Sequence, residues 1–594
     1  MKEDIQARLS TLRKKMKEVG VQAYIIPSTD PHAGEYIPKH WEIRKWVSGF
    51  TGSAGTLVVT EEKAALWTDA RYYLQGTQQL EGTGITLQKD GLSETPSITT
   101  WLTEVLQATN KVGFDGEVNT VAYIESLSQH LATKNITVED TGNLVKGIWT
   151  DQPAIPTEKI HLQELRYAGI GADEKITRIH SFLSTQNPNG AIIITALDEI
   201  AWILNLRGND VPYNPVFMAY LYIDNRHTIL FVDENKLTDS IKAYLQENHI
   251  MVRPYAEIFT GISALPEKYV YIAGTANYKL KQALLSMGKT PVVHPSPIPP
   301  LKAEKNAIEI AGFRSAMERD GVALVKFLRW LLPAVSKGTE TEISVSEKLE
   351  SFRAQSPFYK GASFHTIAGY GANGAIVHYS ATPTQYAHIQ AKGLLLLDSG
   401  AQYVDGTTDI TRTIAVGTLT EEEKRDYTLV LKGFIALSQA SFIEGTCGTQ
   451  LDVLARQFMW KEGINYGHGT GHGVGHYLNV HEGPHQIRMN NVPAPILAGY
   501  TVTNEPGIYR AGKHGIRTEN ILLAVRDRES EFGKFLRFET LTLCPIDKTP
   551  ICTEMLTTEE KEWFNHYHTE VYRRLSPYLD KEECTWLKEA TSAI

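Results

Sequence analysis

The chain has 594 residues, of which 42% are hydrophobic and 21% charged, and it carries a net charge of -9. This length exceeds what a single hydrophobic core supports, so several domains are expected. The composition is that of an ordinary globular protein and excludes a largely disordered chain. The acidic balance argues against a nucleic-acid partner, because phosphate binding requires a clustered basic surface.

The four cysteines lie far apart and form no CxxC spacing. We therefore expect free thiols rather than a zinc site or the disulfide framework of a secreted protein. The N-terminal segment is charged and helical in pattern, without the apolar run of a signal peptide. No internal stretch approaches the roughly 18 apolar residues of a membrane span. These features predict a cytoplasmic protein with no membrane partner.

The N-terminal half contains the same order of elements twice. A helix pattern, a strand, a glycine-rich turn region and a strand hairpin occupy residues 4–73, and a similar order occupies residues 173–233. We read residues 64–73 and 191–200 each as one strand. The repeated order predicts two similar α/β domains.

Two proline-containing segments separate the parts of the chain. Residues 148–160 contain two prolines, and the later linker holds four prolines within residues 295–300. Such segments are typical of domain boundaries. The tail ends in two helix patterns, the first of which begins with the capping-box spacing of Thr557 and Glu560. The predicted domains are residues 1–153, 154–300 and 301–530, with a C-terminal extension at 531–594.

The third domain places two aspartates on either side of a turn. Asp398 ends an apolar strand, residues 404–406 turn the chain, and Asp409 lies on the returning strand. In a hairpin centred there the two would face each other directly, with Cβ atoms about 5 Å apart. Opposed carboxylates repel without a cation, and two metal ions about 3.5–4 Å apart fit this spacing. Taken alone, the pair is equally consistent with two solvated turn acids.

Residues 468–484, with the sequence HGTGHGVGHYLNVHEGP, place four histidines among five glycines. Neutral imidazole is the commonest metal-binding side chain, and glycine lets the backbone approach a ligand closely. By itself this pattern is a weak indication of metal binding, and at least one of the histidines is expected to be structural. The four are His468, His472, His476 and His481.

Two glutamates follow in apolar strand patterns. Glu505 ends one strand and Glu519 lies on the next, with turn residues between them, so the strands are expected to pair antiparallel. A glutamate on an apolar strand is unfavourable unless it is paired or bound to metal. Either residue alone also fits an acid on an edge strand that faces water.

Considered together, these residues indicate a metal site more strongly than any one of them. Four carboxylates and one imidazole carry four negative charges, which balance two divalent cations. The oxygen-rich set suits Mn²⁺ best, with Co²⁺, Zn²⁺ or Fe²⁺ as alternatives. The five candidates are Asp398, Asp409, His472, Glu505 and Glu519.

The segments DSG…TTD…TR, HGTGHGVG, NEPG and RTEN occur in this order. They resemble the five-ligand signature of the pita-bread metallopeptidases, which include methionine aminopeptidase, prolidase and aminopeptidase P. The segments GFTGSAG and TDARYYLQ resemble the N-terminal domain of creatinase and aminopeptidase P. With the length, NVHEGP and FETLTLCPID, the whole chain resembles the long cytosolic form of aminopeptidase P.

The resemblance implies a fold of class α/β (α+β), with two creatinase-N-like α/β domains before a C-terminal pita-bread catalytic domain. It implies a homodimer that hydrolyses the N-terminal Xaa–Pro bond, by a metal-bridging hydroxide, in peptides with proline at the second position. The five candidates become the ligands of two divalent ions, with Glu505 also catalytic. It further implies His378 and His481 as catalytic and substrate-binding histidines, and His472 as a substrate contact.

Arg71 is implied as a substrate contact supplied across the dimer. From the residues alone, an arginine stacked on its aromatic neighbours fits equally well. His468 matches an outer position of the glycine loop. Residues 363–380 depart from the family's pattern, so the lining of the proline pocket is not predicted.

Three alternatives use the same fold. A prolidase would cut Xaa-Pro dipeptides only, and the long N-terminal part and C-terminal tail favour an aminopeptidase. Creatinase dispenses with metal, and some pita-bread domains are metal-free peptide-binding modules. Five intact ligand positions argue against both metal-free alternatives.

Overall fold

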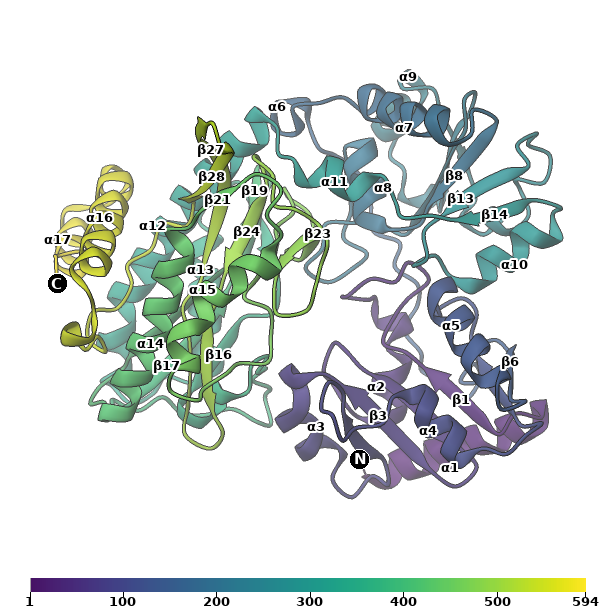
Figure 1. The fold of residues 1–594 in the computed structure, drawn as a ribbon, viewed down its shortest axis with the longest axis horizontal. Coiled ribbons are helices and arrows are strands. Elements are labelled where there is room, and N and C mark those ends of the chain that lie inside the picture. Colours follow the sequence, from purple (N-terminus) through teal and green to yellow (C-terminus); the bar gives the residue numbers. More distant parts are fainter. Residues whose placement is uncertain (1) are drawn as a thin grey trace. The chain divides into compact units, whose positions relative to one another are not determined.

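The computed structural model describes residues 2–594. It divides into two compact units, the first formed by Met1–Gln163 and Ile170–Ile298, the second by Glu164–Gly169 and Pro299–Ile594. Figure 1 shows the elements of each unit, coloured along the chain. Within residues 2–594, no helix combines the length and apolar character needed to cross a bilayer.

The first unit contains two six-stranded sheets of the same topology. The first sheet has the order β4-β3-β2-β1-β5-β6 and the second β12-β11-β10-β8-β13-β14. In the first, β1 pairs antiparallel with β2 and parallel with β5. In the second, β8 likewise pairs antiparallel with β10 and parallel with β13. The predicted repeat of two similar α/β domains is confirmed.

The strands of these sheets are β1 (Ala23–Ile26), β2 (Thr56–Thr60), β3 (Ala64–Thr68), β4 (Thr86–Lys89), β5 (Lys111–Phe114), β6 (Thr137–Asp140), β8 (Gly190–Ile194), β10 (Ala219–Ile223), β11 (Thr228–Val232), β12 (Ile250–Arg253), β13 (Tyr269–Ile272) and β14 (Thr290–Val293). A small sheet pairs β7 (His161–Leu162) with β9 (Leu206–Arg207). The helices are α1 (Lys2–Val19), α2 (Ile43–Ser48), α3 (Tyr73–Leu80), α4 (Ile98–Val105), α5 (Val121–Ala132), α7 (Ala172–Gln186), α8 (Leu197–Leu204), α9 (Asp239–Glu247) and α10 (Tyr278–Ser286), with short 3₁₀ turns η1 (Lys39–Trp41), η2 (Ala70–Tyr72), η3 (Glu234–Lys236) and η4 (Tyr255–Phe259).

Two predicted strands end earlier than expected. β3 ends at Thr68 because the side chain of Asp69 accepts the N–H of Arg71 and caps η2, which leads into α3. β8 ends at Ile194, and the rest of the apolar run forms α8. Periodicity alone does not separate a buried strand from a buried helix in such a run. The predicted strands 64–73 and 191–200 were therefore too long.

The second unit surrounds a six-stranded sheet of order β21-β28-β27-β24-β22-β23 and a three-stranded sheet of order β16-β17-β20. Its strands are β15 (Tyr359–Ala362), β16 (Ile367–Tyr370), β17 (Leu394–Ser399), β18 (Ala401–Tyr403), β19 (Gly406–Thr407), β20 (Ile410–Ala415), β21 (Ser441–Ile443), β22 (Gly471–Gly473), β23 (Glu482–Ile487), β24 (Thr501–Asn504), β25 (Gly507–Arg510), β26 (His514–Arg517), β27 (Asn520–Ser530) and β28 (Gly533–Thr540). The helices are α6 (Leu165–Ala168), α11 (Ile298–Ala303), α12 (Ala307–Val335), α13 (Glu342–Arg353), α14 (Glu421–Ser438), α15 (Gly448–Trp460), α16 (Thr558–Leu575) and α17 (Lys581–Ala590), with 3₁₀ turns η5 (Gly371–Ala375), η6 (Thr553–Met555) and η7 (Ser576–Tyr578).

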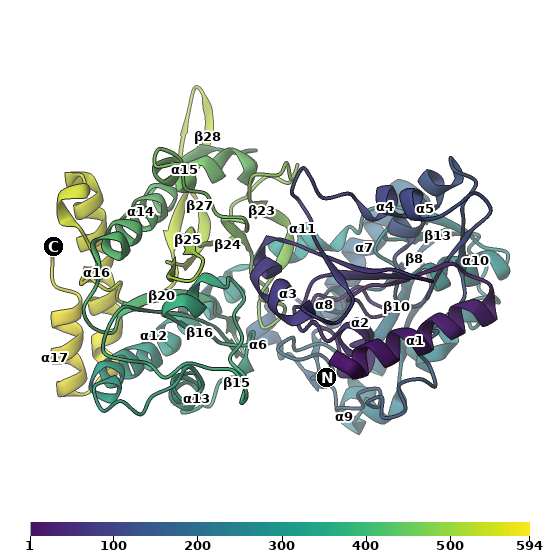
Figure 2. The ribbon, with the colours of Figure 1, turned by 90° about the horizontal axis from the view of Figure 1, so that it is seen from below.

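Helices enclose the core of the second unit. α12 begins with a capping box formed by Asn306 and Glu309 and buries one long face. α16 begins at the predicted capping box of Thr557 and Glu560. It and α17 contact α12 at the C-terminal edge of this unit, as Figures 1 and 2 show. The predicted helical tail is confirmed.

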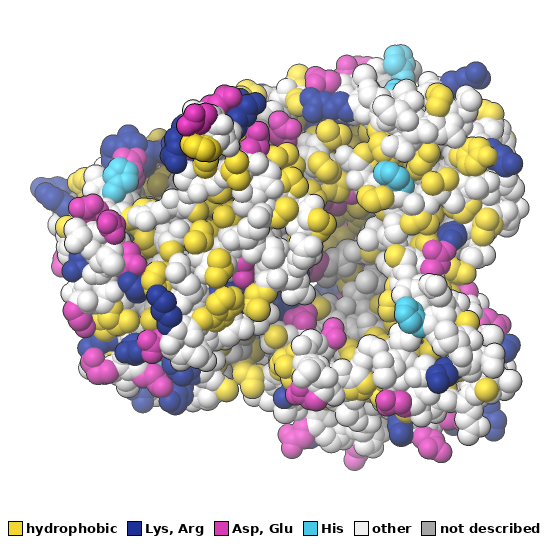
Figure 3. Space-filling model, viewed as in Figure 1, with side chains coloured by type: hydrophobic (Ala, Val, Ile, Leu, Met, Phe, Trp, Pro, Cys, Tyr) yellow, Lys and Arg dark blue, Asp and Glu magenta, His cyan; other side chains and the backbone are white. Residues whose placement is uncertain are grey.

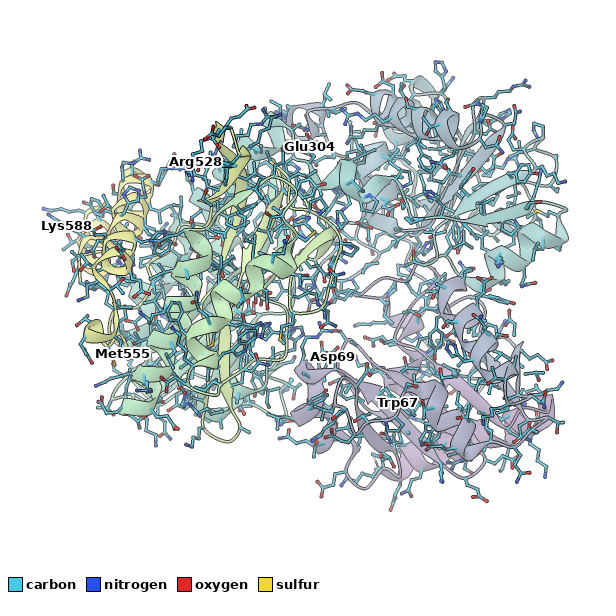
Figure 4. All side chains as sticks on the ribbon, viewed as in Figure 1. Trp67, Asp69, Glu304, Arg528, Met555 and Lys588 are labelled. Atoms are coloured by element: carbon cyan, nitrogen blue, oxygen red, sulfur yellow. The ribbon has the colours of Figure 1, made fainter. Side chains whose placement is uncertain are left out.

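The sheet continues into the C-terminal tail. β27 pairs antiparallel with β28, so the predicted boundary at residues 530 and 531 lies at the tip of one hairpin, near Arg528 in Figure 4. β28 therefore belongs to the same sheet as the strands before that boundary. On the face seen in Figure 3, acidic and basic side chains are interspersed over α16 and α17.

Candidate metal centre

The two aspartates lie on a hairpin whose register differs from the prediction. Asp398 in β17 pairs with Thr411 of β20, not with Asp409. Gln402 pairs with Thr407, so the turn is centred one position later in the chain than expected. The expected direct opposition is wrong. Asp409 is instead a diagonal neighbour of Asp398 on the same face, a relation that typically places Cα atoms about 7–8 Å apart.

The two glutamates lie opposite each other between the β24–β27 ladder and the β25–β26 ladder. Glu505 directly follows β24, whereas Glu519 lies in the connection between β26 and β27 rather than on a strand. Asn504 pairs with Asn520, and Gly507 pairs with Arg517. The same register places Glu505 opposite Glu519. The predicted antiparallel pairing is confirmed, with both carboxylates at a break in the ladder.

His472 stands on β22 between two glycines. A Cβ atom at Gly471 would lie 1.9 Å from the carbonyl oxygen of Thr503 on β24. A Cβ at Gly473 would lie 2.7 Å from that of Glu482 on β23. Only glycine permits this approach. The Nδ1 of His472 lies 2.9 Å from the carbonyl oxygen of Gly473, so Nε2 is the nitrogen that faces the carboxylates.

The ligand atoms converge around that nitrogen. His472 Nε2 lies 3.4 Å from Asp409 Oδ2 and 3.7 Å from Glu505 Oε1. One atom each from Asp409, His472 and Glu519 lies within 4.8 Å of the others. Within residues 2–594, no other set of three His, Cys, Asp or Glu residues brings its ligand atoms this close together. Residues up to 110 positions apart in sequence thus meet at one point of the fold.

The cluster holds more negative charge than its basic neighbours compensate. Burial and the nearby carboxylates raise the pKa of Glu505 to about 7. Burial, with the charge of Asp409, raises the pKa of Glu519 well above its usual range. Burial also raises the pKa of Asp398 despite the nearby guanidinium of Arg517. For His472, burial alone would lower the pKa, but Asp409 and Glu505 outweigh it and raise the pKa to about 9. A bound cation would relieve this repulsion.

The donor set fits divalent ions. Asp398 Oδ2 accepts a hydrogen bond of 2.6 Å from Arg517 Nη2, whereas Asp398 Oδ1 is buried without a hydrogen-bond partner. A buried carboxylate oxygen without a donor is costly, and a metal ion would satisfy it. Four carboxylates and one imidazole match the hard ligands that divalent ions prefer.

Two further residues belong to this cluster and were not predicted. Arg517 binds Asp398, and its Nη1 donates to the hydroxyl of Tyr509 at 2.7 Å. That hydroxyl also lies 2.7 Å from His468 Nε2. A chain of contacts therefore runs from His468 to Asp398. The signal was the RTEN segment, because an arginine on an apolar strand requires a buried partner.

The remaining predicted histidines occupy different places. The ring of His481 lies 4.2 Å from that of His472, with an interplanar angle of 83°. His378 follows η5, and the carbonyl oxygen of the preceding Val377 lies 3.5 Å from Arg517 Nη2. His476 is buried, with its ring 5.5 Å from that of Phe313 on α12.

Comparison with known proteins covers nearly the whole chain. Residues 8–148 and 151–309 each match a creatinase/prolidase N-terminal domain. Residues 311–526 match metallopeptidase family M24, and residues 534–594 match the C-terminal region of that peptidase. The probable Xaa-Pro aminopeptidase P of Paracoccidioides brasiliensis (strain Pb03) is 41% identical over 618 residues, covering 100% of this chain and 99% of the relative. The Aspergillus niger relative of that name is 41% identical over 613 residues, with the same coverage.

This chain belongs to the Xaa-Pro aminopeptidase P family, within the M24 metallopeptidases.

A solved structure agrees with this membership. The X-prolyl aminopeptidase from Caenorhabditis elegans, described as a cytosolic enzyme with a di-nuclear active site, has a TM-score of 0.94 and 34% identity, covering 100% of both chains. The prolidase from Pyrococcus horikoshii OT3, with a TM-score of 0.51 and 24% identity over 63% of this chain, shares the fold. The predicted resemblance and fold class are confirmed.

In this aminopeptidase P family member, Arg71 lies in the first unit, in a local motif that the second domain repeats. Its Nε and Nη2 each donate to Asp69, labelled in Figure 4, at 2.8 Å, and a quarter of its side chain is exposed. Asp69 caps η2 by accepting the N–H of Arg71 at 3.1 Å. In the second domain Asp233 caps η3 by accepting the N–H of Asn235 at 3.0 Å. The aspartate cap is therefore common to both domains, whereas the side-chain contacts of Arg71 are not. The guanidinium of Arg71 also lies over the ring of Tyr72, 5.3 Å from its centroid.

Proposed function

We propose that this chain removes the first residue from peptides with proline at the second position, using two divalent ions held by Asp398, Asp409, His472, Glu505 and Glu519. The observation that carries the proposal is the excess of buried carboxylate in this cluster, including the unpartnered Oδ1 of Asp398. The Xaa-Pro substrate class comes from the relatives' names.

Mn²⁺ is the proposed ion. The candidate ligands are four carboxylates and one imidazole, with no thiolate, and such hard donors favour Mn²⁺ over softer ions. Co²⁺ and Zn²⁺ are the alternatives. When bound, the ions supply a nucleophile at neutral pH by lowering the pKa of water.

The side chains around the cluster supply proton transfer and oxyanion binding. Glu505, opposite Glu519 at the break in the ladder, accepts the proton of the attacking water and passes it to the leaving proline nitrogen. His378 and His481 donate hydrogen bonds to the carbonyl oxygen as it becomes an oxyanion. The ring contact of His481 with His472 supports this role. The free α-amine of the substrate is attracted to the carboxylates, which explains cleavage at the N-terminus.

Proline at the second position explains the need for a dedicated site. A prolyl residue has no N–H and a fixed φ. A groove that binds peptides as an added strand therefore lacks the hydrogen bond that the backbone N–H of this residue would donate. The aminopeptidase site instead holds the substrate through its α-amine and its carbonyl oxygen, which proline leaves intact.

The larger assembly is also part of the proposal. We propose a cytoplasmic homodimer in which Arg71 contacts the substrate bound by the partner subunit. The partial exposure of Arg71, and the asparagine at its counterpart position, support a role beyond folding. The proposed domains are residues 1–153, 154–300 and 301–530, with residues 531–594 as a C-terminal extension of the third.

The main alternative is a prolidase. Comparison of Ala-Pro with Ala-Pro-Ala as substrates, after Mn²⁺ is added to metal-stripped protein, separates the two. An aminopeptidase cleaves the tripeptide efficiently. Cleavage of the dipeptide alone would assign a prolidase, and no cleavage with no bound metal would assign a metal-free peptide-binding module.

A further inference from the structure

Glu342 is a fully buried carboxylate outside the metal cluster. It is the first residue of α13, and 0% of its surface is exposed. Its Oε1 accepts the N–H of Tyr370 at 2.8 Å and the side-chain amide of Asn373 at 2.9 Å. Its Oε2 accepts the hydroxyl of Tyr379 at 2.7 Å and the N–H of Ala387 at 2.7 Å. Four donors thus converge on one carboxylate.

These four donors enclose His378 along the chain. Tyr370 and Asn373 precede it, Tyr379 follows it directly, and Ala387 lies at the far end of the segment. All four donors are neutral, and the start of α13 adds the favourable end of a helix dipole. The N–H of Glu342 also donates to the carbonyl oxygen of Ala387 at 3.2 Å. Both arms of the segment are therefore tied to the same residue.

The segment has little other regular structure to hold it. Between η5 and β17, residues 376–393 contain no helix or strand. Tyr379 is buried, and Asn373 also donates to its hydroxyl at 3.0 Å. On the N-terminal side, Tyr370 already belongs to the ladder of β16 with β17. The bonds to Glu342 tie the irregular stretch around His378 to that ladder and to Ala387 on the far side.

We propose that Glu342 is a positioning residue for His378. The inference rests on the proposed function, in which His378 donates to the developing oxyanion. Such a donor must lie about 2.7–3.1 Å from the oxygen, and a displacement of about 1 Å can cost roughly 10²-fold in rate. Glu342 acts on the reaction through the backbone of residues 370–387, without contact with the substrate.

Two variants weaken the anchor without emptying the site. Glu342→Gln keeps the shape of the side chain but replaces one carboxylate oxygen with an amide nitrogen. That nitrogen cannot accept the hydrogen bonds that the oxygen accepted. Tyr379→Phe removes one donor and leaves the carboxylate in place. Glu560→Gln is the matched control, because Glu560 is a buried glutamate of the same unit that accepts from Lys432 Nζ at 2.6 Å, away from His378.

The test is a kinetic cycle with His378→Ala on the full-length, Mn²⁺-loaded protein and Ala-Pro-Ala. Glu342→Gln is expected to lower kcat by about 10- to 10²-fold with little change in KM, and Tyr379→Phe to lower it less. In the His378→Ala background, Glu342→Gln should cause no further loss. Glu560→Gln should leave kcat unchanged in both backgrounds.

Hydrogen exchange of residues 370–387, with circular dichroism and metal content, accompanies the cycle. Glu342→Gln should speed exchange in this segment while the fold and bound metal stay unchanged. An unchanged exchange rate, an unchanged kcat, or the same loss in both backgrounds would overturn the inference. Full kcat in His378→Ala alone is a separate outcome: it contradicts the proposed role of His378, and the inference falls with it.

Discussion

Two glutamates of the second unit, one buried and one half-buried, have opposite electrostatic surroundings. Glu482 on β23 accepts hydrogen bonds from Lys302 and from Lys305, the latter at 2.5 Å. Burial would raise its pKa, but the two ammonium groups outweigh burial and lower the pKa to about 2. Glu505 lies beyond the end of β24, where burial and the nearby aspartates outweigh His472 and Arg517 and raise its pKa to about 7.

The difference separates a structural carboxylate, Glu482, from a proposed metal ligand, Glu505. At Glu482 the fold supplies two cations from its own chain, Lys302 and Lys305. At Glu342 it supplies four neutral hydrogen-bond donors instead. Around Glu505 the acids outnumber the basic groups, so the cluster holds extra protons in the metal-free protein and, in the proposal, binds cations instead. This account predicts opposite responses when charges are removed from the two regions.

The largest effect is expected for Asp409→Ala. The change removes one of the three atoms that converge at 4.8 Å or less, so turnover should fall to background and metal occupancy should drop. The fold should remain, because the substitution relieves repulsion among carboxylates. Activity on Ala-Pro-Ala, elemental analysis and circular dichroism check this. Full activity with fewer bound ions would refute the assignment of Asp409.

His481→Ala tests the chemistry beside the cluster. Loss of one oxyanion donor typically costs about 10²–10³-fold in rate, and we expect kcat to fall by that factor. Metal content should be unchanged, because His481 is outside the five candidate ligands. Loss of metal in this variant would instead identify His481 as a ligand.

Lys305→Met tests the region around Glu482, where two lysines compensate the buried carboxylate. Breaking a buried ion pair by removing one partner costs about 3–5 kcal/mol in free energy of unfolding, although Lys302 remains and should reduce that cost. We expect a lower midpoint of urea unfolding and two bound ions per folded chain. If the variant binds fewer than two ions per folded chain, the two regions are not independent.

The pH dependence of stability should differ between the metal-free and metal-loaded protein. In the metal-free protein, the pKa of Glu505 rises from 4.5 to about 7, and that of His472 from 6.5 to about 9. The folded state therefore holds protons that the unfolded state has released, and the free energy of unfolding falls as pH rises through both windows. For His472 the contribution is fully present below pH 6.5 and is lost as pH rises through about 9.

Metal binding requires deprotonated ligands, so its stabilising effect grows with pH. The difference in Tm between Mn²⁺-loaded and metal-free protein should widen steadily between pH 5 and 8. Thermal melts of both forms at each pH measure this difference. A constant difference would mean that the metal binds elsewhere.

The smallest effect is expected at Arg71. Arg71→Ala should raise KM for tripeptides with little change in kcat, whereas Asn235→Ala, at the counterpart position in the second domain, should change neither. Mixing Arg71→Ala with Asp409→Ala protein should restore activity in hybrid dimers, because one site in each would be whole. No gain after verified subunit exchange would show that Arg71 does not act across a dimer.

Local signals explain which features the sequence predicts. The capping box of Thr557 and Glu560 spans one turn, and the helix begins there. The register of Asp398 depends on where the chain turns, and a shift of one position moved its partner from Asp409 to Thr411. The apolar run after Ile194 continues as the helix α8. Both β8 and α8 are buried, so their apolar pattern does not show where the strand ends and the helix begins.

Long-range contacts account for what the sequence does not predict. Arg517 reaches Asp398 across 119 positions. Glu342 binds donors 28 to 45 positions away, and no motif marks it in the chain. Such partners become visible only when the strands and loops are placed in space.

The central claim is that the carboxylate excess is met by two divalent ions that drive hydrolysis. Titration of metal-stripped protein with Mn²⁺, following bound metal and cleavage of Ala-Pro-Ala together, tests it most directly. The account predicts saturation at two ions per chain, with activity rising as the sites fill and no saturable binding of two ions in Asp409→Ala. Full turnover in the metal-stripped protein would contradict it.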